Sequence, residues 1–234
     1  MENLFLKYMN ERNLTDKKKA FSAGPVITIS RECGCGASAV ADKLTNRINE
    51  IVNEPEKKWK WVNKEILNRV SEDLKVNPQH VLDHLDAGNT NFFDDFVASF
   101  TEKYYVHDTK IRKVIEEVVR HIAIQGKVVI VGRGSEALTF DIPLSIKVKL
   151  FAPLNWRVKE VCERSKITHE EAQKMVEKVD SQRSKFRDSF LEKNHNVLAN
   201  DIEFNCAKFT QDEIVEVILK IAELRRLFEH QSFH

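Results

Sequence analysis

The sequence predicts an α/β protein built on a parallel β-sheet. Apolar runs without polar breaks, such as VVIVG at 128–132, are typical of strands buried on both faces of a sheet. Between these runs, apolar residues recur at helical spacing over long stretches. This alternation favours a sheet whose strands are joined by crossover helices. A chain of 234 residues is long enough for one large domain or for a domain with a small insert.

Composition and charge exclude several classes of protein. Hydrophobic residues make up 42% of the chain and charged residues 31%, which is ordinary for a globular protein. The formal net charge of +1 gives no support to a protein coated in nucleic acid. The first 20 residues lack the apolar core of a signal peptide, and no run approaches the roughly 20 apolar residues of a membrane helix. We therefore expect a soluble, cytoplasmic protein that has no membrane partner.

The elements are expected in a regular order. Residues 1–24 are interpreted as a short helix and a polar linker, and residues 25–234 as the main domain. The run at 26–29 predicts a first strand, and apolar residues at helical spacing from Val40 to Ile51 predict the helix that follows. The later elements are a short strand within 57–63, a mostly helical region at 64–126, strands at 127–132 and 144–153, helices at 155–164 and 168–193, a strand at 201–209 and a helix at 211–228.

The stretch SRECGCGASA, between the first strand and its helix, is spaced like a phosphate-binding loop. Such loops follow G-x-x-x-x-G-K-[ST]; their backbone N–H groups wrap the phosphates, and the helix N-terminus adds a positive dipole end. With Gly36 at the second glycine, Ser38 takes the hydroxyl position that reaches a metal ion, and Ala37 takes the lysine position. Arg31 falls on the first glycine position, and Gly34 adds a flexible point.

The missing lysine leaves several interpretations of this loop open. In phosphoryl transfer that lysine neutralises charge on the transferring group, and Arg31 and Lys43 are the nearby cations in the sequence that are candidates to replace it. One alternative is a strand-to-helix turn without a ligand. Another is a thiol or metal site at Cys33 and Cys35, although one such pair supplies only two of the four ligands of a tetrahedral site.

Arginines further along the chain are a second group of candidates. Arg133 lies in the Gly-Arg-Gly that ends the strand at 127–132, at the sheet edge where open α/β proteins bind ligands. A guanidinium group in that place suits a phosphate. The other candidates, which share a helix face within each set, are Arg157 with Arg164, and Asp180 with Arg183 and Arg187. A solvated, salt-bridged helix is the alternative interpretation of either set.

Four segments, in this order, resemble the cytidylate kinase-like family of P-loop proteins: ITISRECGCGASAVADKL, VVIVGRG, KLFAPLNWRV and ITHEEAQKMVEKVDSQRSKF. The resemblance runs from Val26 to Phe190. It implies a P-loop NTPase-type three-layer fold, with a five-stranded parallel sheet and helices on both faces. It also implies a helical insert that binds a nucleoside monophosphate, at about 58–107, and a helical lid at about 166–194.

The resemblance also implies an activity, which is transfer of a phosphoryl group from ATP, with Mg²⁺, to a small phosphorylated acceptor such as a nucleoside monophosphate. The implied ATP-binding residues are Arg31, Gly34, Cys35, Gly36, Ala37, Ser38 and Arg157, with Ser38 also reaching Mg²⁺. The implied acceptor-binding residues are Arg133 and Arg164, and the implied catalytic residues are Arg133, Asp180, Arg183 and Arg187. The alternative is an inactive, nucleotide-binding regulatory protein, which is favoured by Ala37, Val131 and Gly134, where cytidylate kinases carry Lys, Glu and Asp.

Overall fold

Five parallel strands form one sheet at the centre of the protein. The structure is a computed structural model that describes residues 23–53, 58–63, 109–191 and 200–228, and the structural statements below concern these ranges. The strands are β1 (Val26–Arg31), β2 (Lys60–Val62), β3 (Val128–Val131), β4 (Ser145–Phe151) and β5 (Ile202–Asn205). Their order across the sheet is β2-β3-β1-β4-β5. Because all pairings are parallel, the carboxyl ends of the strands meet at one edge.

The central strand β1 is covered on both of its faces. It pairs with β3 on one side and β4 on the other, so that Val26 is level with Val128 and with Ser145. Ile27 and Ile29 are fully buried. A parallel strand that is covered on both faces has no position for a solvated side chain, and even the polar Thr28 of β1 is fully buried.

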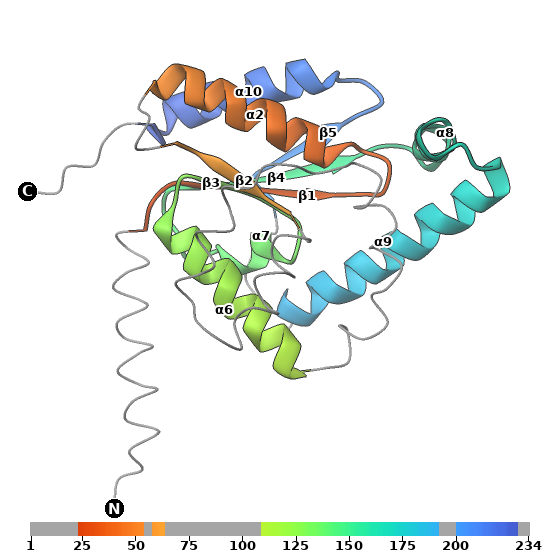
Figure 1. The fold of residues 1–234 in the computed structure, drawn as a ribbon, viewed down its shortest axis with the longest axis horizontal. Helices are drawn as coiled ribbons and strands as arrows, with labels where there is room; N and C mark the ends of the chain where they lie inside the picture. Colours follow the sequence, from red (N-terminus) through yellow and green to blue (C-terminus); the bar gives the residue numbers. More distant parts are fainter. Residues whose placement is uncertain (1–22, 54–57, 64–108, 192–199, 229–234) are drawn as a thin grey trace, which may run out of the picture.

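Helices cover both faces of the sheet (Figure 1). The described helices are α2 (Ala37–Val52), α6 (Thr109–Gln125), α7 (Ser135–Leu138), α8 (Leu154–Ser165), α9 (His169–Leu191) and α10 (Gln211–Leu224). One hydrophobic core joins α2 and α10 to one face, and a second joins α6, α7 and the end of α9 to the other. The protein is therefore a three-layer α/β fold, as the sequence predicts.

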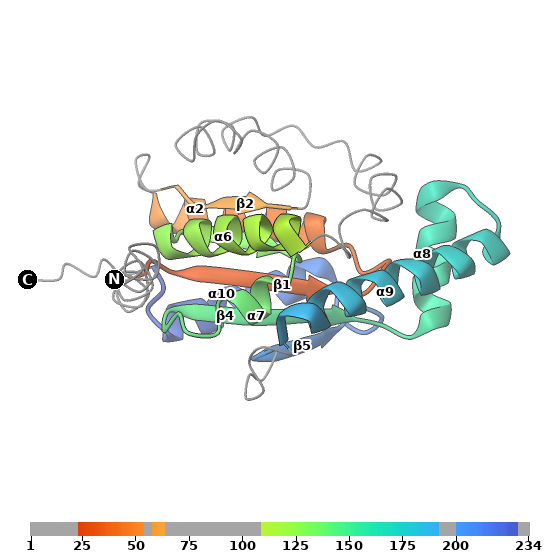
Figure 2. The same ribbon diagram turned by 90° about the horizontal axis from the view of Figure 1, so that it is seen from below.

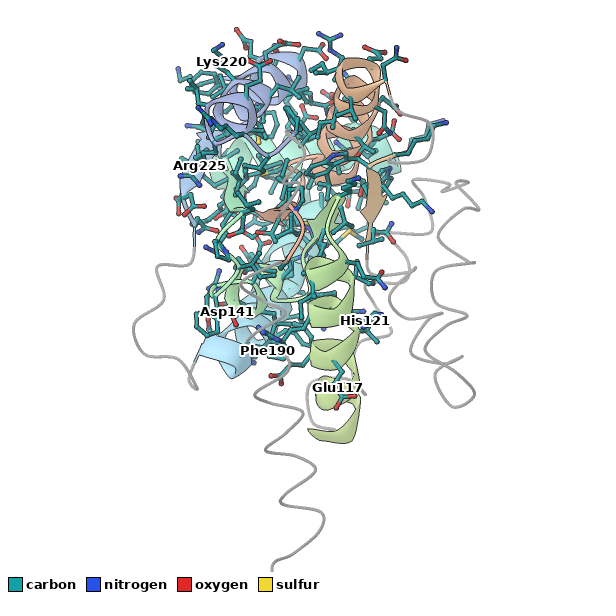
Figure 3. All side chains as sticks on the ribbon, turned by 90° about the vertical axis from the view of Figure 1, so that its left-hand side faces the viewer. Glu117, His121, Asp141, Phe190, Lys220 and Arg225 are labelled. Atoms are coloured by element: carbon teal, nitrogen blue, oxygen red, sulfur yellow. The ribbon has the colours of Figure 1, made fainter. Side chains whose placement is uncertain are left out.

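Helices α8 and α9 extend beyond the carboxyl edge of the sheet, as both ribbon views show (Figures 1 and 2). They pack on each other and on Cys33 through a third apolar cluster that includes Val158, Val161 and Val176. Helix α9 then runs back to the sheet, where Phe190 packs in the second core. Figure 3 shows Phe190 at the end of this helix, on the side of the molecule where α6 lies. One helix thus reaches from the projecting pair to the main domain.

The strand predictions are confirmed, and the main difference from the sequence-based expectation is the short helix α7. Four residues are too few to show a helical period, and Gly134, which has a φ of +65°, precedes the helix as its cap. Arg120 of α6 holds the end of α7 in place, because its guanidinium donates to the carbonyl oxygen of Leu138 and to both oxygens of Asp141, each at 2.9 Å.

Several expected segments lie outside the described residues. They are the N-terminal helix and linker up to residue 22, the insert from 64 onward and the last residues of the expected lid. The insert and lid boundaries therefore stay predictions. Residues 60–62, at the start of the expected insert, form the edge strand β2. Within the described ranges, no helix has both the length and the apolar character that crossing a membrane requires.

Helix α10 begins at a capping box, in which two residues satisfy each other's backbone donors. The Thr210 hydroxyl accepts from the Glu213 N–H at 3.3 Å, and the Glu213 carboxylate accepts from the Thr210 N–H at 2.8 Å. The bond from this backbone N–H lowers the pKa of Glu213. We expect Thr210→Ala to lower the free energy of unfolding by about 1 kcal/mol, measured by urea denaturation. The exposed Lys208→Ala is the control, and an equal effect of the two changes would contradict a role for the cap.

Candidate active site

A large cavity opens at the carboxyl edge of the sheet. Its volume is about 820 Å³, and it is lined by the loops that follow β1 and β3 and by α8 and α9. Of the twelve residues that the sequence predicts for the site, ten line this cavity: Arg31, Gly34, Gly36, Ala37, Ser38, Arg133, Arg164, Asp180, Arg183 and Arg187. The structure therefore brings together residues that lie more than 150 positions apart in the chain.

The loop between β1 and α2 has a conformation that requires glycine. Gly34 has a φ of +96°, and a Cβ atom on it would lie 2.9 Å from the carbonyl oxygen of Arg157. Gly36 is also left-handed, with a φ of +65°, and it caps α2. The first two residues of that helix, Ala37 and Ser38, line the cavity, at the helix end toward which backbone N–H groups point. The loop therefore presents backbone donors and a positive helix end to the cavity.

The cation that is missing at Ala37 is not supplied by Lys43. The Ala37 side chain is buried where the core beneath α2 meets the cavity, and it contributes to both. Lys43, one of the two candidate replacements, lies on the outer surface of α2 and pairs with Asp212 at 2.8 Å. The other candidate, Arg31, lines the cavity. Cations from β1, the β3 loop and the projecting helices therefore surround the loop instead.

Arg157 lies beneath the glycine loop, whereas the sequence suggests a position among the phosphate-binding residues. Its side chain does not line the described part of the cavity but is buried beneath the loop, where its Nε lies 3.1 Å from a Glu32 carboxylate oxygen and donates to the Ala152 carbonyl oxygen at 2.9 Å. Its Nη1 donates to Asp180, and the other Asp180 oxygen accepts from the Cys33 N–H at 2.7 Å. This buried guanidinium holds the phosphate-type loop against α8 and α9.

The loop after β3 carries three consecutive left-handed residues, Gly132, Arg133 and Gly134. A side chain at Gly132 would overlap the guanidinium of Arg31, so that this arginine lies directly over the loop. Arg133 is buried, and its guanidinium carbon lies 5.5 Å from the centre of the Phe186 ring. A non-glycine residue in this backbone region stores strain, which is typical of functional sites.

Helix α9 supplies two further arginines to the cavity. The Arg183 guanidinium donates to the carbonyl oxygen of Arg31 at 3.5 Å. Arg187 donates to Ser184 at 3.1 Å and lies 3.2 Å from Asp188. Arg164 comes from α8, where its side chain is 51% exposed and lies 3.8 Å from Glu160. Together with Arg31, Arg133 and Lys149, these residues give the described lining six cations against the three carboxylates Glu32, Glu136 and Asp180.

The cysteines of the loop do not form a metal centre. Cys33 and Cys35 are free and buried, and no group of three or more potential metal ligands occurs among the described residues. Burial raises the pKa of Cys33 above its ordinary value. The neighbouring Cys206 thiol and burial raise the pKa of Cys35. Both thiols are therefore protonated at neutral pH, and they fill space in a tight loop.

Sequence reasoning missed Glu136. This residue of α7 lines the cavity, yet its side chain is only 2% exposed. Its Oε2 accepts no hydrogen bond from any described residue. Burial raises the pKa of its carboxyl group, against the opposing effects of its own backbone N–H and of Arg187 and Arg31. A single glutamate in a four-residue helix has no local pattern that marks it, so that only its burial in the fold reveals it.

A smaller cavity, of about 310 Å³, adjoins the glycine loop. It lies between α8 and the connection from β5 to α10, and its lining includes Trp156, Lys208 and Phe209. Gly34, Gly36 and Arg164 line both cavities. A ligand bound on the glycine loop therefore has a partly apolar space beside it, next to α8.

The fold and the site together define the class of protein. A five-stranded parallel sheet in this order, with a glycine loop between β1 and α2 and arginines over the carboxyl edge, is a P-loop-type, kinase-like α/β fold. The chain belongs to the cytidylate kinase-like family, whose sequence model matches residues 26–202. No curated protein matches the chain in sequence.

A solved structure shares this architecture. An uncharacterized protein from Eubacterium ventriosum ATCC 27560 is 23% identical, with a TM-score of 0.59, over 86% of this chain and 98% of its own. The shikimate kinase from Bacteroides thetaiotaomicron is 11% identical, with a TM-score of 0.48, over 85% of this chain and 98% of its own. At these identities the likeness concerns the fold, and the chemistry has to be argued from the site.

Proposed function

We propose that the chain is a phosphotransferase that moves a phosphoryl group from ATP to a nucleoside monophosphate. The observation that carries the proposal is the cavity of about 820 Å³, in which the glycine loop and six cationic side chains face one space. This volume lies in the range of small-molecule and cofactor sites. An excess of three positive charges over the three carboxylates suits a ligand that carries several phosphate charges.

The donor end of the site lies on the glycine loop. The N–H groups of Ala37 and Ser38 would hold the ATP phosphates, and the smaller cavity beside α8 would take the base. The Ser38 hydroxyl stands at the second position of α2, where it would bind Mg²⁺. The lining offers backbone donors, a hydroxyl and an excess of cations, which is the donor set that magnesium-bound ATP requires. When bound, Mg²⁺ supplies charge neutralisation on the bridged phosphates.

The transfer itself requires charge stabilisation more than proton transfer. A phosphate oxygen of the acceptor is already ionised near neutral pH, and no general base has to be assigned. Arg31, Arg133 and Arg183 would stabilise the charge on the transferring group in the place of the missing lysine. Arg157 and Asp180 would act as positioning residues, because their contacts hold the loop and not the cavity contents.

A second candidate function is nucleotide binding without transfer, which Ala37 at the lysine position specifically favours. The two functions differ in a direct assay. The full chain is given ATP, Mg²⁺ and a panel of nucleoside monophosphates, and ADP release is measured together with ATP binding by calorimetry. Release of ADP that depends on one acceptor supports the phosphotransferase. Tight ATP binding without ADP release for any acceptor would leave the regulatory function.

Restoring the lysine tests whether its loss limits the rate. We expect Ala37→Lys to raise the turnover number about 10-fold, because a lysine from this position adds a cation at the transferring group. Ala39→Lys is the matched control, since Ala39 also lines the cavity but stands one position beyond the hydroxyl of the motif. If both variants change the rate equally, only the net charge of the cavity matters. If Ala37→Lys gives no increase, the arginines already replace the lysine.

A further inference from the structure

The buried carboxyl group of Glu136 needs a partner that the described protein does not provide. Its side chain is only 2% exposed, and its Oε2 accepts no hydrogen bond from the described residues. Buried polar atoms in folded proteins are nearly always hydrogen-bonded, because an unpaired one keeps its full desolvation cost. Glu136 also lines the main cavity. The cavity is therefore a place from which a ligand can supply a partner to Glu136.

The groups around Glu136 define the chemistry of that partner. Arg31 from β1 and Arg187 from α9 act on its charge. The Arg187 guanidinium donates to Ser184 and Asp188, and the Arg133 guanidinium lies over Phe186. The carboxylate thus lies among cations that also line the cavity. An anionic ligand that also carries a hydrogen-bond donor satisfies both kinds of group.

A metal ion or a protein side chain fits less well as the partner of Glu136. A metal ion would require further oxygen, nitrogen or sulfur ligands, and the described residues contain no group of three that could hold one. Position 134 cannot supply a side chain as the partner, because a Cβ on Gly134 would lie 2.7 Å from the Phe190 ring. Glu136 is the residue of the β3 loop and α7 that brings a carboxyl group to the cavity.

We propose that Glu136 determines acceptor specificity by accepting a hydrogen bond from a donor group of the acceptor, while the arginines bind its phosphate. The inference rests on the proposed phosphotransferase function and adds the chemical requirement that the acceptor be a phosphate ester with a hydrogen-bond donor within reach of Glu136. In a nucleoside monophosphate this donor is either an amino group of the base or a hydroxyl group of the ribose. Both sources present the same chemistry to the carboxylate.

Pairs of ligands that differ in one donor distinguish the two sources. CMP and UMP differ by an amino group against a carbonyl oxygen, and CMP and dCMP differ by one ribose hydroxyl. Binding to the full chain is measured by calorimetry, and turnover by ADP release. We expect the wild type to prefer the donor-bearing member of one pair by about 10- to 100-fold, because a buried acceptor that is left without a donor keeps its desolvation cost. In Glu136→Ala the preference should fall to within about 3-fold. The affinity for the member of the pair that lacks the donor should change little.

Control variants separate recognition from a structural role. Glu136→Gln keeps an acceptor oxygen, and it should retain part of the preference that Glu136→Ala loses. Glu117→Ala removes an exposed carboxylate on α6, labelled in Figure 3, and it should leave every ratio unchanged. If Glu136→Ala weakens all ligands equally, the carboxyl group is structural and the inference is overturned.

The two proposals fail in different ways. In one outcome, the wild type discriminates within a ligand pair in binding, Glu136→Ala does not, and the wild type releases no ADP. This outcome would overturn phosphotransfer but support the role of Glu136. In another outcome, the wild type phosphorylates the monophosphates but shows no preference within either pair. This outcome would overturn the role of Glu136 but support phosphotransfer. If the wild type binds none of the three monophosphates, the role of Glu136 is overturned, and phosphotransfer is then decided by ADP release with the wider panel.

Discussion

Arg157→Ala is expected to lower the free energy of unfolding by about 3 kcal/mol, because removing one member of a buried ion pair leaves charges without their partner. Glu32 and Asp180 would lose the guanidinium that lies between them, and the Cys33 carbonyl oxygen would lose its donor. The loop would also lose its attachment to α8, so that ATP binding should weaken as well. Urea denaturation measures the first effect and calorimetry the second.

Arg164→Ala is the matched control for this prediction. Arg164 lies two turns further along the same helix, but its side chain is half exposed and its carboxylate partner is 3.8 Å away. Exposed pairs contribute little, so the unfolding free energy should change by less than about 0.5 kcal/mol. Arg157→Lys should not restore stability, since an ammonium group cannot reproduce a planar guanidinium with several partners. Equal destabilisation by Arg157→Ala and Arg164→Ala would contradict the structural role of Arg157.

Arg183→Ala is expected to lower kcat/KM about 100- to 1000-fold, which is the usual effect of removing one group that stabilises transition-state charge. Arg183 lines the cavity from α9 and contacts the backbone of Arg31, so that it faces the place where the phosphoryl group would pass. Most of the loss should be in kcat, because the charge develops only during transfer. Steady-state kinetics with varied ATP and acceptor separates the two parameters.

Lys185→Ala is the control for Arg183→Ala, since Lys185 is exposed on the same helix and does not line the described cavity. It should leave kcat/KM within about 3-fold of the wild-type value, because a charge that is well separated from the reacting group is screened by salt. The unfolding free energy of Arg183→Ala should also stay close to the wild-type value, since the side chain is only half-buried. A rate loss that matches a loss of folded protein would contradict a role in transfer.

The sequence predicts the sheet well because parallel strands leave a strong local signal. β1 and β3 are covered on both faces, and β3 is a run of apolar residues that can be recognised without the rest of the fold. Helix α7 has no such signal, because it is shorter than the repeat by which helices are recognised. Its position follows from the left-handed Gly134 and from the hydrogen bonds of Arg120, which lies on another helix, α6.

The sequence predicts which residues lie near the candidate site. It does not predict which of them line the cavity and which lie buried beneath the loop. Arg157 and Arg164 are seven residues apart, which places both on one face of α8. Nevertheless, Arg157 is buried under the loop, and Arg164 lines both cavities. Helical periodicity gives the face of a residue, but not its distance from another element. Lys43 lies close to the loop in sequence, but its helix carries it to the surface and to Asp212. Long-range packing decides these differences.

Helix α9 packs in two separate clusters, and this limits which segments can be exchanged with those of a relative. Its first half packs with α8 through Val176 and Val179, and its last turns pack through Phe186 and Phe190 into the core beside α6. The helix has 23 residues, so it is about 35 Å long and acts as one rod between the two clusters. A segment that replaces α8 and α9 would therefore have to match the packing of α6 and α7 as well as the packing within the projecting pair. The projecting pair and the core beside α6 form one unit of exchange, which sets the boundary for any chimaera made with another member of the family.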